Sequence, residues 1–180
     1  MQYHHDGYVG RNPRIRNAEG TGLNRSAELP ETMDVLIVDA GPAGIVQAAQ
    51  LTEYPEVHTR IIEARPQRLA AGRADGLFPR SCETFQAFEF YDEIAHEAAH
   101  MREMSFWGPH PENPAEIARG ARADDPPAYV SEFPILTVNQ ARVIDYFAER
   151  AENGPARINI NYGVEFLDLV VHETGEYPVE

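Results

Sequence analysis

Cysteine is almost absent from this 180-residue sequence, and the single residue, Cys82, excludes an internal disulfide. Long hydrophobic runs are also absent, since no stretch approaches the roughly 20 apolar residues that a membrane-spanning helix needs. The first residues, Met1 to Asp6, lack the basic start and the apolar core of a secretion signal. These absences together predict a cytoplasmic protein that has no membrane-spanning segment.

Basic residues are scarce relative to acidic ones. The sequence has 15 basic and 29 acidic residues, which gives a formal net charge of -14. Such a surface repels phosphate backbones and anionic lipids, so we expect the chain to bind neither nucleic acid nor membranes. An anionic cofactor would gain nothing from this charge and would depend on local backbone dipoles and a few placed arginines.

The hydrophobic pattern predicts an α/β domain with a Rossmann-like start. Residues 1–32 lack apolar periodicity and indicate a surface arm, and residues 33–180 form the domain that follows. The continuous apolar run 34–38 predicts a buried parallel strand, residues 45–51 predict a helix, and residues 59–63 predict a second strand. A strand, a Gly-rich turn, a helix and a strand in this order make a βαβ unit.

The turn between the first strand and the helix has residues suited to a dinucleotide. A pyrophosphate binds at a helix N-terminus, where free N–H groups face it, and Gly41 and Gly44 allow close backbone approach and helix–strand contact. Glu63, about 20 residues further on, can accept hydrogen bonds from a ribose. Asp39 replaces the first glycine of this fingerprint, and its carboxylate is expected to weaken pyrophosphate binding, at about 3 kcal/mol per charge pair. A tight loop without a ligand is the alternative.

The rest of the chain alternates between helical and extended patterns. Pro79 begins a helix with Cys82 and Phe85 on its buried side, and Asn139 caps a helix that runs to about residue 152. We also expect a helix at 91–101 and strands at 104–107, 117–121, 157–160 and 164–172. The aromatic residues Phe106 and Trp107 are expected in a hydrophobic core.

Four segments in a fixed order carry a resemblance to a known family: Val35–Gly44, Ile62–Pro66, Gly72–Ser81 and Asn139–Val143. Together they resemble the class A flavin monooxygenases, in the branch of phenol 2-monooxygenase and 3-hydroxybenzoate 4-monooxygenase. Tyr3-His4, Gly10–Pro13 and Ser131–Pro134 are similar to that branch too. The resemblance covers essentially the whole chain. It implies the N-terminal part of a GR2-type, p-hydroxybenzoate hydroxylase-like FAD/NAD(P)-binding domain, which is incomplete because the family's second FAD motif and thioredoxin-like domain lie beyond residue 180.

The resemblance also implies an activity and a set of site residues. The family binds FAD, takes electrons from NADPH and uses O₂ to hydroxylate a phenolic ring. The full-length form of this protein is expected to be a homodimer. Asp75 matches a catalytic acidic residue of the family, whose carboxylate orients the phenol or accepts its proton. The matching cofactor residues are Gly41, Pro42, Ala43 and Gly44 at the pyrophosphate, Glu63, Ala64 and Arg65 at the adenosine, Gly72, Arg73, Ala74 and Asp75 along the flavin, and Gln140 and Arg142 as further FAD contacts.

The sequence departs from this branch at two positions and allows two other functions. Arg73 stands where the branch usually has Gln, and Ile135 stands where the 3-hydroxybenzoate enzymes place a substrate-site His, so the exact phenol stays open. His96-Glu97-Ala98-Ala99-His100 matches the H-E-x-x-H pattern of zinc hydrolases, which needs both histidines on one helix. No third ligand follows at the expected spacing, so we predict no metal. The other alternative is a truncated, inactive Rossmann-type remnant or interaction module.

Overall fold

The computed structural model describes residues 2–4, 7–9, 15–127 and 129–180, so Gly10–Pro13 of the resemblance lie outside the described residues. The chain divides into two compact units, Met1–Ala70 with Val143–Glu180, and Ala71–Arg142. Among the described helices, none combines the length and the apolar character that spanning a bilayer requires.

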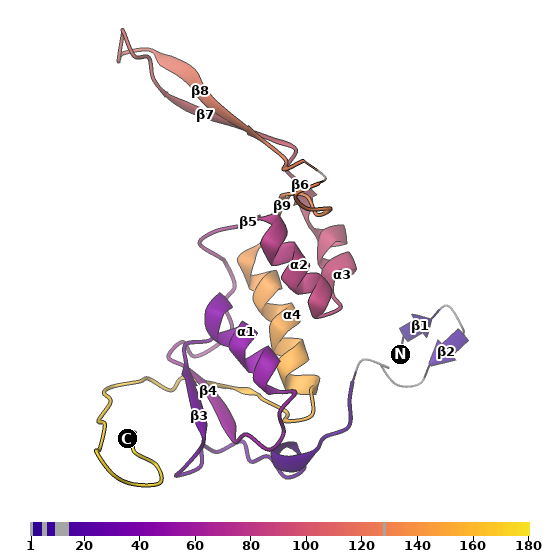
Figure 1. The fold of residues 1–180 in the computed structure, drawn as a ribbon, viewed down its shortest axis with the longest axis vertical. Helices are drawn as coiled ribbons and strands as arrows, with labels where there is room; N and C mark the ends of the chain where they lie inside the picture. The colour runs from indigo at the N-terminus through magenta and orange to yellow at the C-terminus, as the bar shows by residue number, and fades with distance from the viewer. Residues whose placement is uncertain (1, 5–6, 10–14, 128) are drawn as a thin grey trace. The chain divides into compact units, whose positions relative to one another are not determined.

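The first unit is built on a three-stranded parallel sheet. Its elements are β3 (Val35–Val38), α1 (Pro42–Leu51), β4 (Thr59–Glu63) and β10 (Ile160–Tyr162). The strand order is β10-β4-β3, so β4 is central, and all five of its residues are buried. Helix α1 packs against β3 and β4 (Figure 1) through its buried residues Ile45, Ala48 and Ala49. The predicted βαβ unit is therefore confirmed, with both of its strands at the expected positions.

Helix α4 (Gln140–Asn153) runs from the second unit into the first. Asn139 caps it as predicted, because the Asn139 side-chain oxygen accepts a hydrogen bond from the N–H of Ala141 at 2.8 Å. The C-terminal end of α4 is tied to the end of α1 by Thr52, which is fully buried. The Thr52 hydroxyl donates to the Ala151 carbonyl at 2.9 Å, and the Thr52 carbonyl accepts from the N–H of Ala156 at 3.0 Å.

The N-terminal arm has more structure than a loop. Strands β1 (Gln2–His4) and β2 (Gly7–Val9) form an antiparallel hairpin, and a single 3-10 turn, η1, spans Gly20–Gly22. Arg25 donates to the backbone carbonyls of Ala156, at 2.9 Å, and Thr59. Arg60, which is 4% exposed, donates to the Ser26 carbonyl at 2.8 Å. These bonds fasten residues 25 and 26 to β4 and to the loop that precedes β10.

The second unit combines two helices, a small sheet and a hairpin. Its elements are β5 (Gly76–Leu77), α2 (Pro79–Ala87), α3 (Tyr91–Glu97), β6 (Ala99–His100), β7 (Glu103–Pro109), β8 (Ile117–Asp124) and β9 (Leu136–Thr137). Strand β9 lies between β5 and β6, and β7 pairs with β8 as a two-stranded ribbon (Figure 1). Pro79 begins α2 as predicted, and Cys82 and Phe85 are buried on it.

Three expectations about these elements are wrong. The helix expected at 91–101 ends at Glu97, because Ala98 is extended and the next two residues pair with β9. The strand expected at 157–160 starts only at Ile160, because Arg157 has a φ of 52°, which interrupts an extended chain. Within the described residues, the stretch 164–172 forms no strand and has one isolated bridge, between Val171 and Val179.

The aromatic pair on β7 is exposed rather than buried in a core. Phe106 is 52% exposed and Trp107 is 65% exposed. Within the described part of the chain, β7 pairs only with β8, and a two-stranded ribbon has no second layer of its own to cover its side chains. The strands themselves were predicted at about the right positions.

Candidate functional site

The Gly-rich turn of the first unit is closed by an aspartate. Asp39 follows β3 with a φ of +79°, in the left-handed region that glycine adopts most easily and that Asp tolerates better than most residues. Its Oδ2 accepts a hydrogen bond from the N–H of Gly41 at 2.9 Å. Asp39 therefore makes the bend that the fingerprint assigns to a glycine, and stabilises it through its own side chain.

The glycines of this turn are required by close packing. A Cβ on Gly44 would collide with the backbone carbonyl of Asp39 and would contact the side chain of Ile37, so α1 can approach β3 only with glycine here. Ala43 and Gly44 lie in the first turn of α1, where N–H groups have no partner within the helix. These N–H groups and the positive end of the helix dipole are suited to an anion.

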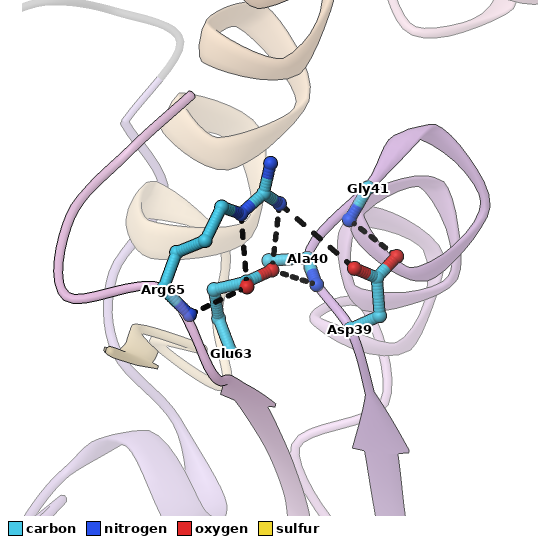
Figure 2. Close-up of polar contacts among 5 residues, drawn as sticks. All are labelled: Asp39, Ala40, Gly41, Glu63 and Arg65. Atoms are coloured by element: carbon cyan, nitrogen blue, oxygen red, sulfur yellow. Dashed lines mark hydrogen bonds and ion pairs between the residues drawn. The ribbon is translucent and has the colours of Figure 1, made fainter. Parts of the chain in front are cut away.

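Glu63 ends β4 beside this turn and is held by four hydrogen bonds. Its side chain is 4% exposed. Oε1 accepts from the backbone N–H of Arg65 at 2.8 Å and from Arg65 Nε at 2.9 Å, and Oε2 accepts from Arg65 Nη2 at 2.7 Å and from the N–H of Ala40 at 3.0 Å (Figure 2). The Arg65 side chain above all, and then the two backbone N–H groups, hold the pKa of Glu63 at about 2 against the opposing effect of burial.

Arg65 contacts both carboxylates of this cluster. Its Nη2 lies 2.7 Å from Glu63 Oε2 and 3.8 Å from Asp39 Oδ1 (Figure 2). Its hydrogen bonds to Glu63, and the negative charges of Glu63 and Asp39, raise the pKa of the guanidinium. The cluster lies at the carboxyl ends of β3 and β4, which is the edge where parallel α/β sheets bind ligands.

A second group of predicted residues comes together in the second unit. The side-chain oxygen of Gln140 accepts from the N–H of Arg73 at 2.8 Å, and Asp75 Oδ1 accepts from the N–H of Gln140 at 3.3 Å. A Cβ on Gly72 would collide with the Cβ of Gln140. Arg73, Ala74 and Asp75 are exposed. The segment 72–75 therefore lies against the start of α4, where the resemblance also placed a cofactor contact.

Arg142 has a protein partner that the sequence did not reveal. Its Nε and Nη2 each donate to one oxygen of Glu97 at 2.7 Å, in a bidentate ion pair. Glu97 is the residue that the H-E-x-x-H pattern would make a catalytic base. No local sequence pattern indicates this ion pair, because Glu97 and Arg142 are 45 residues apart in the chain.

The structural premise of the zinc hydrolase is wrong. Helix α3 ends at Glu97, so His96 lies on the helix and His100 lies on β6. Asp92 O lies 2.7 Å from His96 Nδ1, and Asp125 Oδ2 lies 2.8 Å from His100 Nε2. The described residues contain no group of three or more side chains that could hold a metal ion.

Two donors to the candidate site escaped the sequence reasoning. The N–H of Ala40 bonds Glu63, and the N–H of Gly41 bonds Asp39. The bond from Ala40 to Glu63 could have been predicted from the strand pairing. Because β3 and β4 are parallel neighbours with Val38 opposite Ile62, the residues at the carboxyl ends of the two strands meet at one edge of the sheet.

A comparison with protein-family models decides which family this geometry belongs to. The model described as FAD binding domain matches residues 32–179. The chain belongs to the FAD binding domain family. The glycines and the helix N-terminus of this FAD binding domain suit the pyrophosphate of such a cofactor, whereas the Asp39 carboxylate opposes it and the Glu63 oxygens already accept four hydrogen bonds.

The relatives of this FAD binding domain confirm its resemblance to flavin monooxygenases. It is 41% identical over 180 residues to 3-hydroxybenzoate 4-monooxygenase of Comamonas testosteroni, covering 99% of this chain and 28% of the relative. It is 34% identical over 143 residues to the FAD-dependent monooxygenase terD of Aspergillus terreus, and this match covers 78% of this chain and 23% of the relative. The chain thus spans about a quarter of the length of these curated relatives.

A solved structure confirms the fold class of this FAD binding domain. The flavin-dependent monooxygenase PieE, in complex with FAD and substrate, matches with a TM-score of 0.62 and 22% sequence identity. The match covers 81% of this chain and 26% of that chain. The α/β, Rossmann-like prediction is therefore correct for the part of the fold that the chain contains.

Proposed function

We propose that the chain is the FAD-binding portion of a flavin-dependent monooxygenase that hydroxylates a phenolic aromatic substrate with NADPH and O₂. The observation that carries the proposal is the buried, ionised Glu63 at the carboxyl end of β4, beside a glycine turn and the free N-terminus of α1. The 41% identity to a 3-hydroxybenzoate 4-monooxygenase supports the phenolic substrate class. Neither a zinc hydrolase nor an inactive remnant gains support from these matches.

In this proposal the domain comprises residues 33–180 behind an arm of residues 1–32. The protein is cytoplasmic, and its full-length form is a homodimer that takes part in the catabolism of aromatic compounds. The acidic surface fits a small-molecule substrate rather than nucleic acid or membranes.

The first unit would hold the ADP half of the cofactor. The turn Gly41, Pro42, Ala43 and Gly44 would bind the pyrophosphate through the free N–H groups of the first turn of α1. Glu63 is ionised at neutral pH and would accept the ribose hydroxyls, and Ala64 and Arg65 would flank the adenosine. The close contact of Gly44 with β3 supports this assignment, because it keeps the helix N-terminus beside the strand ends.

The second unit would contribute residues to the flavin and the substrate. The proposed FAD contacts in this unit are Gly72, Arg73, Ala74, Gln140 and Arg142. When bound, FAD would supply the redox chemistry by which NADPH and O₂ place one oxygen atom on the ring and release the other as water. Asp75 is the proposed proton acceptor for the phenol hydroxyl. Its Oδ1 is held by the N–H of Gln140, and within the described residues no donor contacts its Oδ2.

Co-elution of FAD with the purified chain on gel filtration tests the binding claim, and oxidation of NADPH with a phenol tests catalysis. We expect flavin absorbance to travel with the purified chain. Because the chain spans only 28% of its 41% identical relative, we expect it to be inactive alone, and ¹⁸O from ¹⁸O₂ should appear in the product only with the full-length protein. Flavin that separates from the protein contradicts the cofactor assignment. Bound flavin without any product from the full-length protein favours the interaction module over a working enzyme.

A further inference from the structure

The carboxylate of Glu63 has no acceptor position left for a ribose. An ionised carboxylate offers about four lone-pair positions. Four donors already occupy them: the N–H groups of Ala40 and Arg65, and Nε and Nη2 of the Arg65 side chain (Figure 2). All four distances lie between 2.7 and 3.0 Å, so each is a full hydrogen bond. A ribose hydroxyl can bond Glu63 only if one of these donors leaves.

The guanidinium of Arg65 is the donor that can leave. The N–H groups of Ala40 and Arg65 belong to the backbone at the ends of β3 and β4, and they cannot withdraw without moving the strands. The Arg65 side chain is 39% exposed and sits on a flexible stem. Its departure would free one lone pair on each oxygen of Glu63, which matches the two hydroxyls of a ribose.

Asp39 provides a second position for the departing guanidinium. Gly41 N–H fixes Oδ2 of Asp39, while Oδ1 lies 3.8 Å from Arg65 Nη2, the atom that bonds Glu63. A shift of about 1 Å would bring Nη2 within hydrogen-bond distance of Oδ1. The Asp39 side chain is 66% exposed, so it accepts this partner without first breaking a buried contact.

We propose that the Arg65 guanidinium is a switch between two carboxylates, bonding Glu63 in the free chain and Asp39 when a ribose occupies Glu63. The inference rests on the proposed function, since it names the event that opens the ribose site. It gives Asp39 a role at the position where the fingerprint has a glycine. Arg65 on Asp39 also offsets the negative charge that Asp39 would otherwise present to a pyrophosphate. Arg65 thus acts as a positioning residue for Glu63.

The test measures how strongly the protein recognises the ribose hydroxyls. Isothermal titration at pH 7 gives the Kd of ADP and of 2′,3′-dideoxy-ADP, and the ratio of the two Kd values is compared between the full chain and its variants. In the parent chain the ratio is small, about threefold, because ribose bonds are gained as arginine bonds are lost. Arg65→Gln removes the competitor and raises the ratio to about tenfold or more. Asp39→Asn removes the second carboxylate and lowers the ratio toward one.

Opposite shifts from the two variants are the signature of the switch. A merely structural role for Arg65 would change both Kd values by the same factor and leave the ratio unmoved. Arg65→Lys, which keeps one charged donor, should bring the ratio back toward the parent value. If Arg65→Gln fails to fold, Asp39→Asn still tests the switch, because its ratio should fall below the parent value. Circular dichroism without ligand identifies the folded variants.

The outcomes separate this inference from the function on which it rests. A ratio that is equal in the parent, Arg65→Gln and Arg65→Lys chains overturns the switch while leaving FAD binding intact. Failure of the parent chain to bind both FAD and ADP contradicts the proposed function and the switch together. A ratio that rises with Asp39→Asn would show that Asp39 does not receive the guanidinium, and it too overturns the proposal.

Discussion

Glu63 is expected to make the free energy of unfolding depend on pH, and Glu63→Gln should remove its part of this dependence. Its pKa falls from 4.5 to about 2 on folding, chiefly through the hydrogen bonds from the Arg65 side chain. That difference corresponds to about 3 kcal/mol of folding free energy at neutral pH. Glu63 is 4% exposed, so solvent screens this interaction little at the carboxylate, although Arg65 is 39% exposed.

The direction of the pH dependence follows from the lowered pKa. Because the folded state holds the carboxylate ionised, the contribution of Glu63 is fully present above about pH 4.5 and is lost as the pH falls toward about 2. Glu63→Gln removes the titrating group. The parent chain should exceed this variant in unfolding free energy by about 3 kcal/mol at pH 7 and by only about 1.4 kcal/mol at pH 3.

Urea denaturation followed by circular dichroism at the two pH values measures this difference. Glu56→Gln is the matched control, because Glu56 is an exposed glutamate of the same unit, and its unfolding free energy should stay within about 0.5 kcal/mol of the parent value. An equal gap between parent and Glu63→Gln at pH 7 and pH 3 would refute the hydrogen-bonded ion pair as the source of the stability.

Two further predictions concern the second unit. Gly72→Ala should lower the unfolding free energy in urea denaturation by about 1–3 kcal/mol, because the new Cβ collides with Gln140. Gly76→Ala is the control and should cost less than about 1 kcal/mol, because its Cβ meets no atom within 4 Å. Equal losses in the two variants would contradict the contact between Gly72 and Gln140. Cys82 is fully buried, and burial raises the pKa of its thiol to about 11, so a thiol reagent at pH 7.5 should label it only in urea; rapid labelling of the native chain would contradict the burial.

The first unit was predictable because its signals are local. The apolar run 34–38, the glycine turn and the apolar run 59–63 each fall within one element, and a parallel strand covered on both faces has few other interpretations. Asn139 and Pro79 mark helix starts for equally local reasons. The polar contacts at the sheet edge depend instead on which strands are neighbours, so the bond from Ala40 to Glu63 became visible only in the structure.

The misplaced elements show where local patterns give way to longer-range pairing. Residues 98–100 continue a helical pattern, but the backbone bonds that β6 makes with β9 end the helix at Glu97. The left-handed conformation of Arg157 interrupts an extended pattern that has no glycine to mark the break. The ion pair between Glu97 and Arg142 joins α3 to α4, and the helical periodicity of the sequence does not indicate which residues of two helices pair.

The turn 39–44 with Glu63 is proposed to bind the ADP half of FAD, and a comparison of ligands tests this assignment most directly. Isothermal titration of the chain with FAD, ADP and FMN separates the two halves of the cofactor. We expect FAD and ADP to bind, ADP to compete with FAD, and FMN to bind at least about tenfold more weakly than FAD, because FMN lacks the adenosine and one phosphate of the pyrophosphate. FMN binding as tight as FAD binding, with no competition from ADP, would contradict it.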